Sequence, residues 1–301
     1  MHRLAVTCLL SVCLLRTVDV HAQTKRTEDV IYGRKFGTAL TMDVFEPEKT
    51  NGYGIIFMVS GGFFSAKEAI SQKTYTPFLE RGYTVFAVVH GSQPRFHIPE
   101  IEQDIHRAVR FIRHNAKRFG VDPEHFGITG GSAGGHLSLT MGTQGGPGNA
   151  EAKDPVDRES SAVQAVACFY PPTDFLNWSK PGEDAVGYGP TEKFSPAFGP
   201  RNASAEGRRE LGKEISPIYY IGSNMPPTLI IHGDSDKLVP LYQARIFIER
   251  AVELHAPAKL IVRKGKDHGW PGMDADMRIF ADWFDNHLRG KDTRVSSSSD
   301  R

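Results

Sequence analysis

Short apolar runs alternate with amphipathic stretches along most of this chain. Residues 53–60, for example, are an unbroken apolar run followed by two glycines, which suits a strand buried on both faces of a sheet. Residues 99–119 instead carry apolar side chains at steps of three and four, the spacing of an amphipathic helix. The pattern predicts strands at residues 29–33, 39–45, 53–60, 83–89, 125–129, 163–169, 228–231 and 259–263. It predicts helices at residues 66–81, 99–119, 133–142, 241–254 and 276–288.

The order of these elements predicts the fold class. Strands that alternate with helices favour a mainly parallel α/β sheet with helices on both faces. Residues 29–33 and 39–45 have no helix between them, so an antiparallel hairpin is expected to open the sheet. Residues 173–215 are too long for a structureless connection in a compact domain. We interpret them as an insertion, or lid, over the functional edge of the sheet.

The first 22 residues have the pattern of a secretory signal peptide. A basic start at Arg3 is followed by an uncharged apolar run over residues 4–15, and Ala22 offers a small residue for cleavage before Gln23. We therefore expect export, to the periplasm or the medium. The mature chain is expected to be a single domain over residues 23–290 with a disordered, serine-rich tail at 291–301.

Composition indicates a globular protein and no particular partner. Of the 301 residues, 40% are hydrophobic and 24% are charged, and the formal net charge is +1. There is no basic run, so neither nucleic acid nor an anionic membrane surface is indicated. The apolar run at residues 4–15 is shorter than the roughly 20 residues that a membrane span needs. The oligomeric state stays open, and Cys168, alone in the mature chain, has no intrachain disulfide partner.

The glycine-rich stretch at residues 128–136 reads Ile-Thr-Gly-Gly-Ser-Ala-Gly-Gly-His. A phosphate-binding loop would need a lysine and a hydroxyl residue where His136 and Leu137 stand. The pattern G-x-S-x-G is met by Gly130, Ser132 and Gly134, between a predicted strand and a predicted helix. In such a nucleophile elbow the residues two before and two after the serine face each other closely, so glycine suits both places. The stretch therefore predicts Ser132 as a nucleophile, whereas the role of His136 stays open.

A serine nucleophile needs a base and an orienting carboxylate, which in this strand–helix arrangement follow it in the order acid, then histidine. The predicted strand at 228–231 runs into Asp234 and Asp236, and Asp236 is favoured because it lies further over the sheet edge. The predicted strand at 259–263 runs into a loop with His268, which we interpret as the base. His232 is interpreted as a structural loop histidine.

These motifs resemble those of the α/β-hydrolase superfamily, specifically its small esterase and acetyl-esterase branch, described as feruloyl-esterase-like or alpha/beta hydrolase fold-3. The resemblance extends over roughly residues 30–290 and is carried by residues 60–64, 115–123, 130–137, 226–240 and 267–269. It implies Ser132 as nucleophile, Asp236 as orienting acid and His268 as base. It implies an oxyanion hole made by the N–H groups of Gly62, Phe63 and Ala133.

The chain departs from the pattern of this family in two places. The family usually has His-Gly-Gly-Gly, or His-Gly-Gly followed by an aromatic residue. Here Ser60 stands in place of that histidine and Phe63 in place of the third glycine. Residues 90–95 read His-Gly-Ser-Gln-Pro-Arg, where many members have a Tyr-Arg-Leu motif.

The resemblance implies a carboxylic-ester hydrolase that works through an acyl-enzyme, with no metal or cofactor. Export and the family together imply short-acyl esters as substrates, such as acetyl or feruloyl groups on polysaccharides. A peptidase of the prolyl-oligopeptidase type would use the same three side chains. Those enzymes generally carry a large N-terminal β-propeller, for which residues 23–290 leave no room. A non-catalytic binding module on the same fold is the third alternative.

Overall fold

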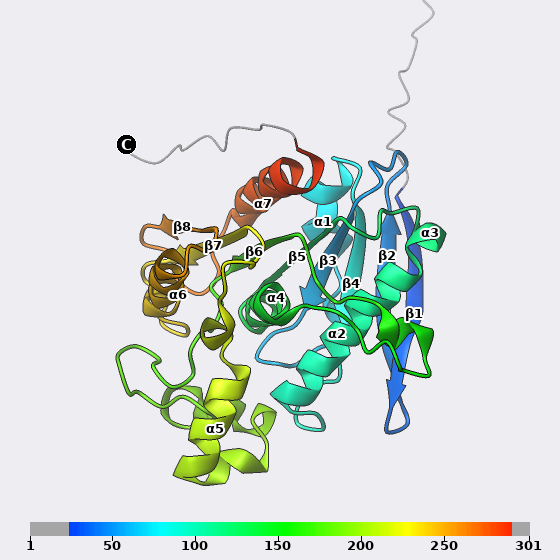
Figure 1. Ribbon diagram of the computed structural model, residues 1–301. Helices are drawn as coiled ribbons and strands as arrows, with labels where there is room; N and C mark the ends of the chain where they lie inside the picture. The colour runs from blue at the N-terminus through cyan, green and yellow to red at the C-terminus, as the bar shows by residue number, and fades with distance from the viewer. Residues whose placement is uncertain (1–23, 291–301) are drawn as a thin grey trace, which may run out of the picture.

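The computed structural model describes residues 24–290, which contain an eight-stranded sheet with helices on both of its faces (Figure 1). The predicted signal peptide over residues 1–22 and the predicted tail over residues 291–301 lie outside the described residues. The assignment of residues 23–290 to a single domain stays a prediction. Within the described range, none of the helices combines the length and the apolar character that crossing a membrane requires.

The sheet has the order β1-β2-β4-β3-β5-β6-β7-β8 and is parallel except at one edge. There, β1 and β2 form the predicted antiparallel hairpin, and β2 pairs antiparallel with β4. The strands are β1 (Lys25–Lys35), β2 (Thr38–Glu46), β3 (Gly54–Val59), β4 (Thr84–Val89), β5 (Phe126–Gly131), β6 (Ala165–Phe169), β7 (Thr228–Gly233) and β8 (Ala258–Arg263). The mainly parallel α/β class predicted from the element order is confirmed.

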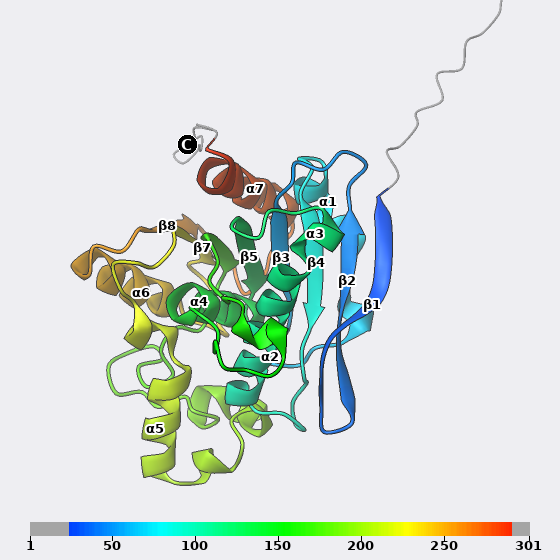
Figure 2. The same ribbon diagram turned by 45° about the vertical axis from the view of Figure 1, so that its right-hand side comes forward.

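Helices cover the sheet on both sides, as Figure 2 shows from a second direction. One face is covered by α2 (Ile98–His114), α4 (Ala133–Gln144) and α6 (Leu241–Glu253). The opposite face is covered by α1 (Gln72–Leu79) and α7 (Met273–Arg289). Short 3₁₀ helices occupy Lys67–Ala69, Pro155–Arg158, Gly189–Ala197, Pro200–Ala203 and Pro217–Tyr220.

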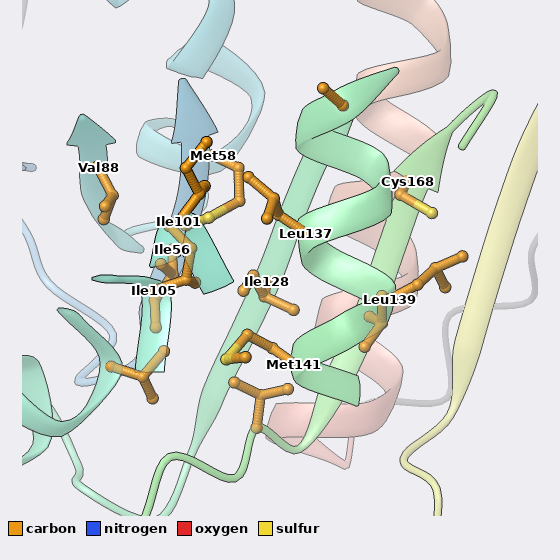
Figure 3. Close-up of a cluster of buried hydrophobic side chains, with 14 of the residues drawn as sticks. Ile56, Met58, Val88, Ile101, Ile105, Ile128, Leu137, Leu139, Met141 and Cys168 are labelled. Carbon is orange, nitrogen blue, oxygen red and sulfur yellow. The ribbon is translucent and has the colours of Figure 1, made fainter. Parts of the chain in front are cut away.

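Each face of the sheet has its own hydrophobic core. Successive residues of β3 point to opposite faces, so Ile55 lies in the core under α1 and α7 while Ile56 lies in the other. Figure 3 shows this other core, where Ile128 of β5 and Leu137 of α4 lie among the buried side chains. Because both faces are covered, the central strands β3, β4 and β6 are almost entirely apolar, which is the pattern that identified them in the sequence. The edge strand β8 is less buried and carries Lys259 and Arg263.

Two predicted helices are shorter than expected. The helix predicted at residues 66–81 begins only at Gln72, because Ile70 takes an extended backbone and its side chain packs against the core under α1 and α7. The helix predicted at 99–119 is broken at Asn115 into α2 and α3 (Ala116–Phe119). The Asn115 backbone leaves the helical conformation (φ −102°, ψ 16°), and its side-chain amide donates at 2.8 Å to the Phe111 carbonyl, which also accepts the Asn115 backbone N–H at 3.1 Å.

The inserted segment, residues 173–215, contains α5 (Ala205–Ile215) and two of the 3₁₀ helices. It lies beyond the carboxyl ends of the parallel strands, in the lower part of Figure 1. Its aromatic side chains line a cavity at Ser132. The insertion over the functional edge of the sheet is therefore present as predicted.

Candidate active site

Ser132 lies in the sharp turn between β5 and α4, where the sequence predicts a nucleophile elbow. Its backbone has φ +55° and ψ −121°, an unusual conformation for a residue with a side chain. A Cβ atom on Gly130 would lie 2.6 Å from the carbonyl carbon of Gly134, and one on Gly134 would lie 2.8 Å from the carbonyl oxygen of Met58. Both positions therefore require glycine, and the tight turn presents the Ser132 hydroxyl at the carboxyl edge of the sheet.

The structure brings Ser132, His268 and Asp236 into one hydrogen-bonded chain, which we call the triad. The Oγ atom of Ser132 lies 2.9 Å from Nε2 of His268, and Nδ1 of His268 lies 2.8 Å from Oδ2 of Asp236. An ionised carboxylate can only accept hydrogen bonds, so Nδ1 carries a proton and Nε2 accepts the hydroxyl hydrogen of Ser132. This is the tautomer in which a histidine can take a proton from a serine.

Asp236 accepts hydrogen bonds from other groups in addition to His268. Its Oδ1 accepts hydrogen bonds from the N–H groups of Leu238 and Val239, each at 2.9 Å. Its Oδ2 also lies 3.3 Å from Nε2 of the fully buried His232, a contact that sequence reasoning did not assign. Burial alone would raise the pKa of Asp236, but the hydrogen bonds from His232, His268 and Val239 outweigh it and hold the pKa well below its usual range. The carboxylate therefore stays charged beside the base.

Asp234, the alternative orienting acid, does not contact the base. It is exposed, and its Oδ1 accepts a hydrogen bond from the Gly265 N–H at 2.6 Å. Asp267 makes a similar link, because its Oδ1 accepts from the N–H groups of Lys237 at 3.0 Å and His268 at 2.7 Å. The two aspartates hold the loop that carries the base against the loop that carries Asp236.

Tyr170, in the loop directly after β6, packs against the base. Its ring centroid lies 4.4 Å from that of His268. The Tyr170 hydroxyl donates to the sulfur of Met273 at 3.7 Å, and burial, together with the charge of Asp236, raises the pKa of Tyr170 to about 12. A neutral tyrosine therefore supports one side of the histidine ring. Its position right after a buried strand is the signal in the sequence that makes Tyr170 a candidate for lining the site.

The predicted oxyanion loop folds into a tight turn at residues 61–64, which we call the oxyanion turn. The backbone N–H and C=O groups of Gly61 and Phe64 pair with each other at 2.9 Å. Gly62 and Phe63 between them have φ angles of +55° and +62°, as in a type I′ turn. Among the hydrogen bonds of the described residues, none is donated by the N–H groups of these two central residues. Both groups are therefore free to face a developing oxyanion.

Ala133 carries the third predicted oxyanion donor. As the first residue of α4, it has an N–H group without a partner inside the helix, at the positive end of the helix dipole. Gly62, Phe63, Ser132 and Ala133 all line one small cavity. The structure thus places the three predicted oxyanion-hole residues together beside the predicted nucleophile.

His136, whose role the sequence left open, is fully buried behind the oxyanion turn. Its ring packs edge-on against Phe63 at 5.3 Å and Phe175 at 5.4 Å. Its Nε2 lies 3.4 Å from Oε1 of the buried Glu102, whose pKa is raised by that burial. His136 therefore supports the ring of Phe63 from behind and does not face the nucleophile.

A second serine–histidine pair, Ser60 and His90, borders the same edge of the sheet. Nε2 of His90 lies 2.8 Å from Oγ of Ser60, and Nδ1 lies 2.8 Å from the Gly91 carbonyl. Burial lowers the pKa of His90 to about 4, so the ring is neutral at pH 7 and a weak base. His90 faces a backbone carbonyl where His268 faces a carboxylate. Of the two serine–histidine pairs, the one in the triad therefore has the carboxylate that can stabilise an imidazolium.

The buried His90 predicts a loss of stability in acid. Its unfolded pKa is about 6.5 and its folded pKa about 4, so between these values the unfolded chain binds more protons and unfolding becomes easier as the pH falls. The shift of the His90 pKa contributes roughly 3 kcal/mol to the free energy of unfolding at pH 7. We expect the difference in unfolding free energy between wild type and His90→Gln, measured in urea, to shrink by about this amount from pH 7 to pH 4. An equal difference at both pH values would contradict the neutral, buried state of His90.

A serine–histidine–aspartate chain beside free N–H donors, at the carboxyl edge of a mainly parallel sheet, defines the α/β-hydrolase class. Comparison with known proteins narrows this class to a family. The BD-FAE family model matches residues 42–250, and the chain belongs to this family. The esterase branch of the α/β-hydrolases, inferred from the sequence motifs, is confirmed.

Two curated relatives come from Mycobacterium tuberculosis. The chain is 27% identical over 243 residues to LipM, a probable carboxylic ester hydrolase, and 29% identical over 232 residues to the esterase LipQ. These matches cover 78% and 74% of this chain but only 54% and 52% of the relatives. The chain therefore spans about half the length of the curated relatives it matches.

Solved structures show the same fold over nearly the whole described chain. A truncated carbohydrate esterase from gut microbiota superposes with a TM-score of 0.72 at 28% identity, covering 88% of this chain and 96% of that one. The esterase Est2 of the planctomycete Thermogutta terrifontis superposes with a TM-score of 0.68 at 21% identity, covering 91% and 94%. At 21% identity, the similarity to Est2 shows a shared fold only.

Proposed function

We propose that this protein is a serine carboxylic-ester hydrolase that works through an acyl-enzyme. The observation that carries the proposal is the triad, in which Ser132, His268 and Asp236 are joined by hydrogen bonds of 2.9 and 2.8 Å next to free N–H donors. The relatives described as esterases support the same class of reaction.

The geometry supports a two-step reaction. Ser132 Oγ attacks the ester carbonyl carbon while its proton passes to Nε2 of His268, and Asp236 stabilises the imidazolium that forms. The carbonyl oxygen becomes an oxyanion that faces the N–H groups of Gly62, Phe63 and Ala133. The C–O bond then breaks, and the alcohol leaves with the proton held by His268. Water repeats these steps on the acyl-enzyme, which releases the acid and restores the serine.

Two cavities meet at Ser132 and suggest where each half of the ester lies. An open cleft of about 840 Å³ is lined by Ser132, His268, Tyr170 and Phe64, among others. A cavity of about 30 Å³, which we call the acyl cavity, is lined by Ser132 and Ala133 but not by His268. Since His268 must protonate the leaving alcohol, the alcohol half belongs in the open cleft and the acyl half in the acyl cavity.

The acyl cavity favours very short acyl groups. A group the size of a water molecule needs about 10–15 Å³ of cavity volume. The acyl cavity of about 30 Å³ therefore admits roughly two non-hydrogen atoms beyond the carbonyl. Its walls include Phe175, Trp178, Phe194 and Phe198 of the inserted segment, which make it apolar. Acetyl and propionyl groups fit this space and a feruloyl group does not. We therefore favour acetyl over feruloyl esters within the substrate class implied by the sequence.

The open cleft suits a large alcohol, and we propose acetylated polysaccharides as the substrates. The carbohydrate esterase from gut microbiota, at 28% identity, supports a carbohydrate on the alcohol side. The test is a panel of p-nitrophenyl esters with acyl chains of two to eight carbons, together with acetylated xylan and methyl ferulate. We expect the acetate ester and acetylated xylan to be hydrolysed best. Preference for methyl ferulate would overturn the acyl assignment, and no hydrolysis of any ester would overturn the proposed function.

Phe194 is expected to limit acyl length, because it lines both the acyl cavity and the open cleft. Phe194→Ala would remove the ring between them and join the two spaces. We expect the ratio of kcat/KM for p-nitrophenyl hexanoate to that for the acetate to rise at least about tenfold, since a few buried methylenes at ~0.8 kcal/mol each are worth that much. The matched control is Phe64→Ala, which removes a ring that is 56% exposed at the alcohol side and should leave the acyl-length ratio unchanged. An unaltered ratio in Phe194→Ala would show that another wall sets the limit.

We also propose that the protein is exported. The proposal is supported by the apolar run at residues 4–15 after Arg3 and by the small residue at Ala22. N-terminal sequencing of the protein recovered from the medium or periplasm should begin at Gln23. Recovery in the cytoplasm with Met1 in place would overturn it.

A further inference from the structure

The oxyanion turn is supported from one side by the segment that follows β4, residues 90–93. This segment lies next to the turn because β3 and β4 are neighbouring parallel strands that end at the same edge. Its hydrogen bonds to the loop after β3 are made by His90 Nε2 to Ser60 Oγ (2.8 Å), His90 N to Ser65 Oγ (3.2 Å), Ser65 N to Ser92 Oγ (3.1 Å), Gln93 N to Phe63 O (3.2 Å) and Gln93 Nε2 to Gly62 O (3.4 Å).

The last of these bonds acts on the peptide unit between Gly62 and Phe63. In a planar trans peptide the C=O of one residue and the N–H of the next point in opposite directions. The Gln93 side-chain amide donates to the Gly62 carbonyl, so it fixes the direction in which the Phe63 N–H points. That N–H is one of the oxyanion donors of the proposed function.

The local sequence of the turn does not favour the conformation observed. A type I′ turn needs positive φ at both central residues, whereas a type II′ turn needs it only at the first, where glycine is preferred. The central residues here are Gly62 and Phe63, and Phe63 holds a φ of +62° that is unfavourable for a residue with a side chain. Rotating the central peptide would convert the turn to type II′ and relieve Phe63. It would also turn the Phe63 N–H away from Ser132.

The opposite side of the turn is closed by the inserted segment. A Cβ atom on Gly62 would lie 2.6 Å from Cε1 of Phe194, so the turn lies between the Phe194 ring and Gln93. The ring of Phe63 is held among His136, Phe175 and Phe198 at centroid distances of 5.3 to 6.5 Å. These apolar contacts anchor the Phe63 side chain, but they place no donor on the Gly62 carbonyl.

We propose that Gln93 is a positioning residue that keeps the oxyanion turn in its type I′ form, so that the Phe63 N–H faces the oxyanion. The inference rests on the proposed function for its catalytic consequence. Because a residue with a side chain, such as Phe63, does not favour a positive φ, the hydrogen bond from Gln93 in the loop after β4 supplies the conformational control that the local sequence lacks.

The test is Gln93→Met, which keeps the volume of the side chain and removes its N–H donors. We expect kcat for p-nitrophenyl acetate to fall about 10- to 100-fold with little change in KM, since one oxyanion donor is worth at most about 10²–10³ in rate. Thermal unfolding serves as the control for folding. Gln93→Glu also lacks an N–H donor, so its kcat should fall at least as far as that of Gln93→Met. Gln103 is an exposed glutamine on α2, and Gln103→Ala should keep the kcat of the wild type.

A double variant separates positioning from a general structural role. Phe63→Gly introduces a residue that accepts positive φ, so Gln93→Met should cost less than about threefold in kcat in that background. An equal loss of kcat in both backgrounds would overturn the proposal, as would full wild-type kcat in Gln93→Met.

A crystal structure of Gln93→Met tests the turn without any assay. We expect Phe63 to move to a negative φ, near −80°, as in a type II′ turn. Retention of the positive φ would overturn the positioning role. If the wild type hydrolysed no ester, the proposed function would fail alone, because the crystal structure would still decide whether Gln93 holds the turn.

Discussion

Replacing Ser132 by alanine is expected to lower kcat/KM for p-nitrophenyl acetate by about 10⁴-fold or more. Without Oγ no acyl-enzyme forms, and only binding and the oxyanion hole are left to assist direct attack by water. The nearby Ser60 cannot substitute, because His90 beside it has its pKa lowered to about 4 by burial and has no carboxylate partner. The variant should fold normally, since the substitution removes one atom at the cleft. Its unfolding temperature checks this.

Covalent labelling gives an independent readout of the nucleophile. A fluorophosphonate should modify wild type on the peptide that contains Ser132, as located by mass spectrometry, and should not modify Ser132→Ala. Modification of the peptide that contains Ser60, or activity within tenfold of wild type in the variant, would show that the assignment of the nucleophile is wrong.

Replacing Asp236 by asparagine is expected to lower kcat by about 10⁴-fold, comparable to the loss known for this substitution in serine proteases. Oδ1 of an asparagine can still accept from the N–H groups of Leu238 and Val239, so the loop should keep its shape. An amide NH₂ in place of Oδ2 would donate to Nδ1 of His268. The ring would then carry its proton on Nε2, which could no longer accept the proton of Ser132.

The matched control for this variant is Asp234→Asn in the same loop. Asp234 is exposed and bonds the Gly265 N–H, and it makes no contact with the base. We expect its kcat to stay within about threefold of wild type. If the kcat of Asp234→Asn fell as far as that of Asp236→Asn, orientation of the base by Asp236 could not explain the loss of kcat.

The fold class and the three side chains of the triad could be predicted because each has a local signal. Fully apolar runs identify buried parallel strands, and the carboxyl ends of parallel strands meet at one edge. Ser132 follows such a run directly, Asp236 follows another after Asp234 and Ser235, and His268 follows the last strand after a short loop. Chain order then assigned their roles. The elbow was the strongest signal, because the close approach of Gly130 to Gly134 depends only on residues within the turn.

The helix boundaries were less predictable because they depend on competition between local and distant contacts. Ile70 could continue a helix by its residue type, but its burial against a core built from other segments favours an extended backbone. Asn115 ends α2 with a non-helical backbone and a side-chain amide bonded to the Phe111 carbonyl, which the periodic pattern on either side does not reveal.

By itself, the sequence determined the order of strands and helices, the elbow around Ser132 and the identity of the residues at the sheet edge. These follow from periodicity and short-range sterics, which neighbouring residues settle among themselves. The sequence favoured Asp236 over Asp234, and the tertiary structure shows the contact of Asp236 with the base. Only the tertiary structure decided that Phe194 lines the acyl cavity and that Gln93 bonds the Gly62 carbonyl. Those outcomes depend on distances between segments far apart in the chain and on the space left between their side chains, which no local pattern encodes.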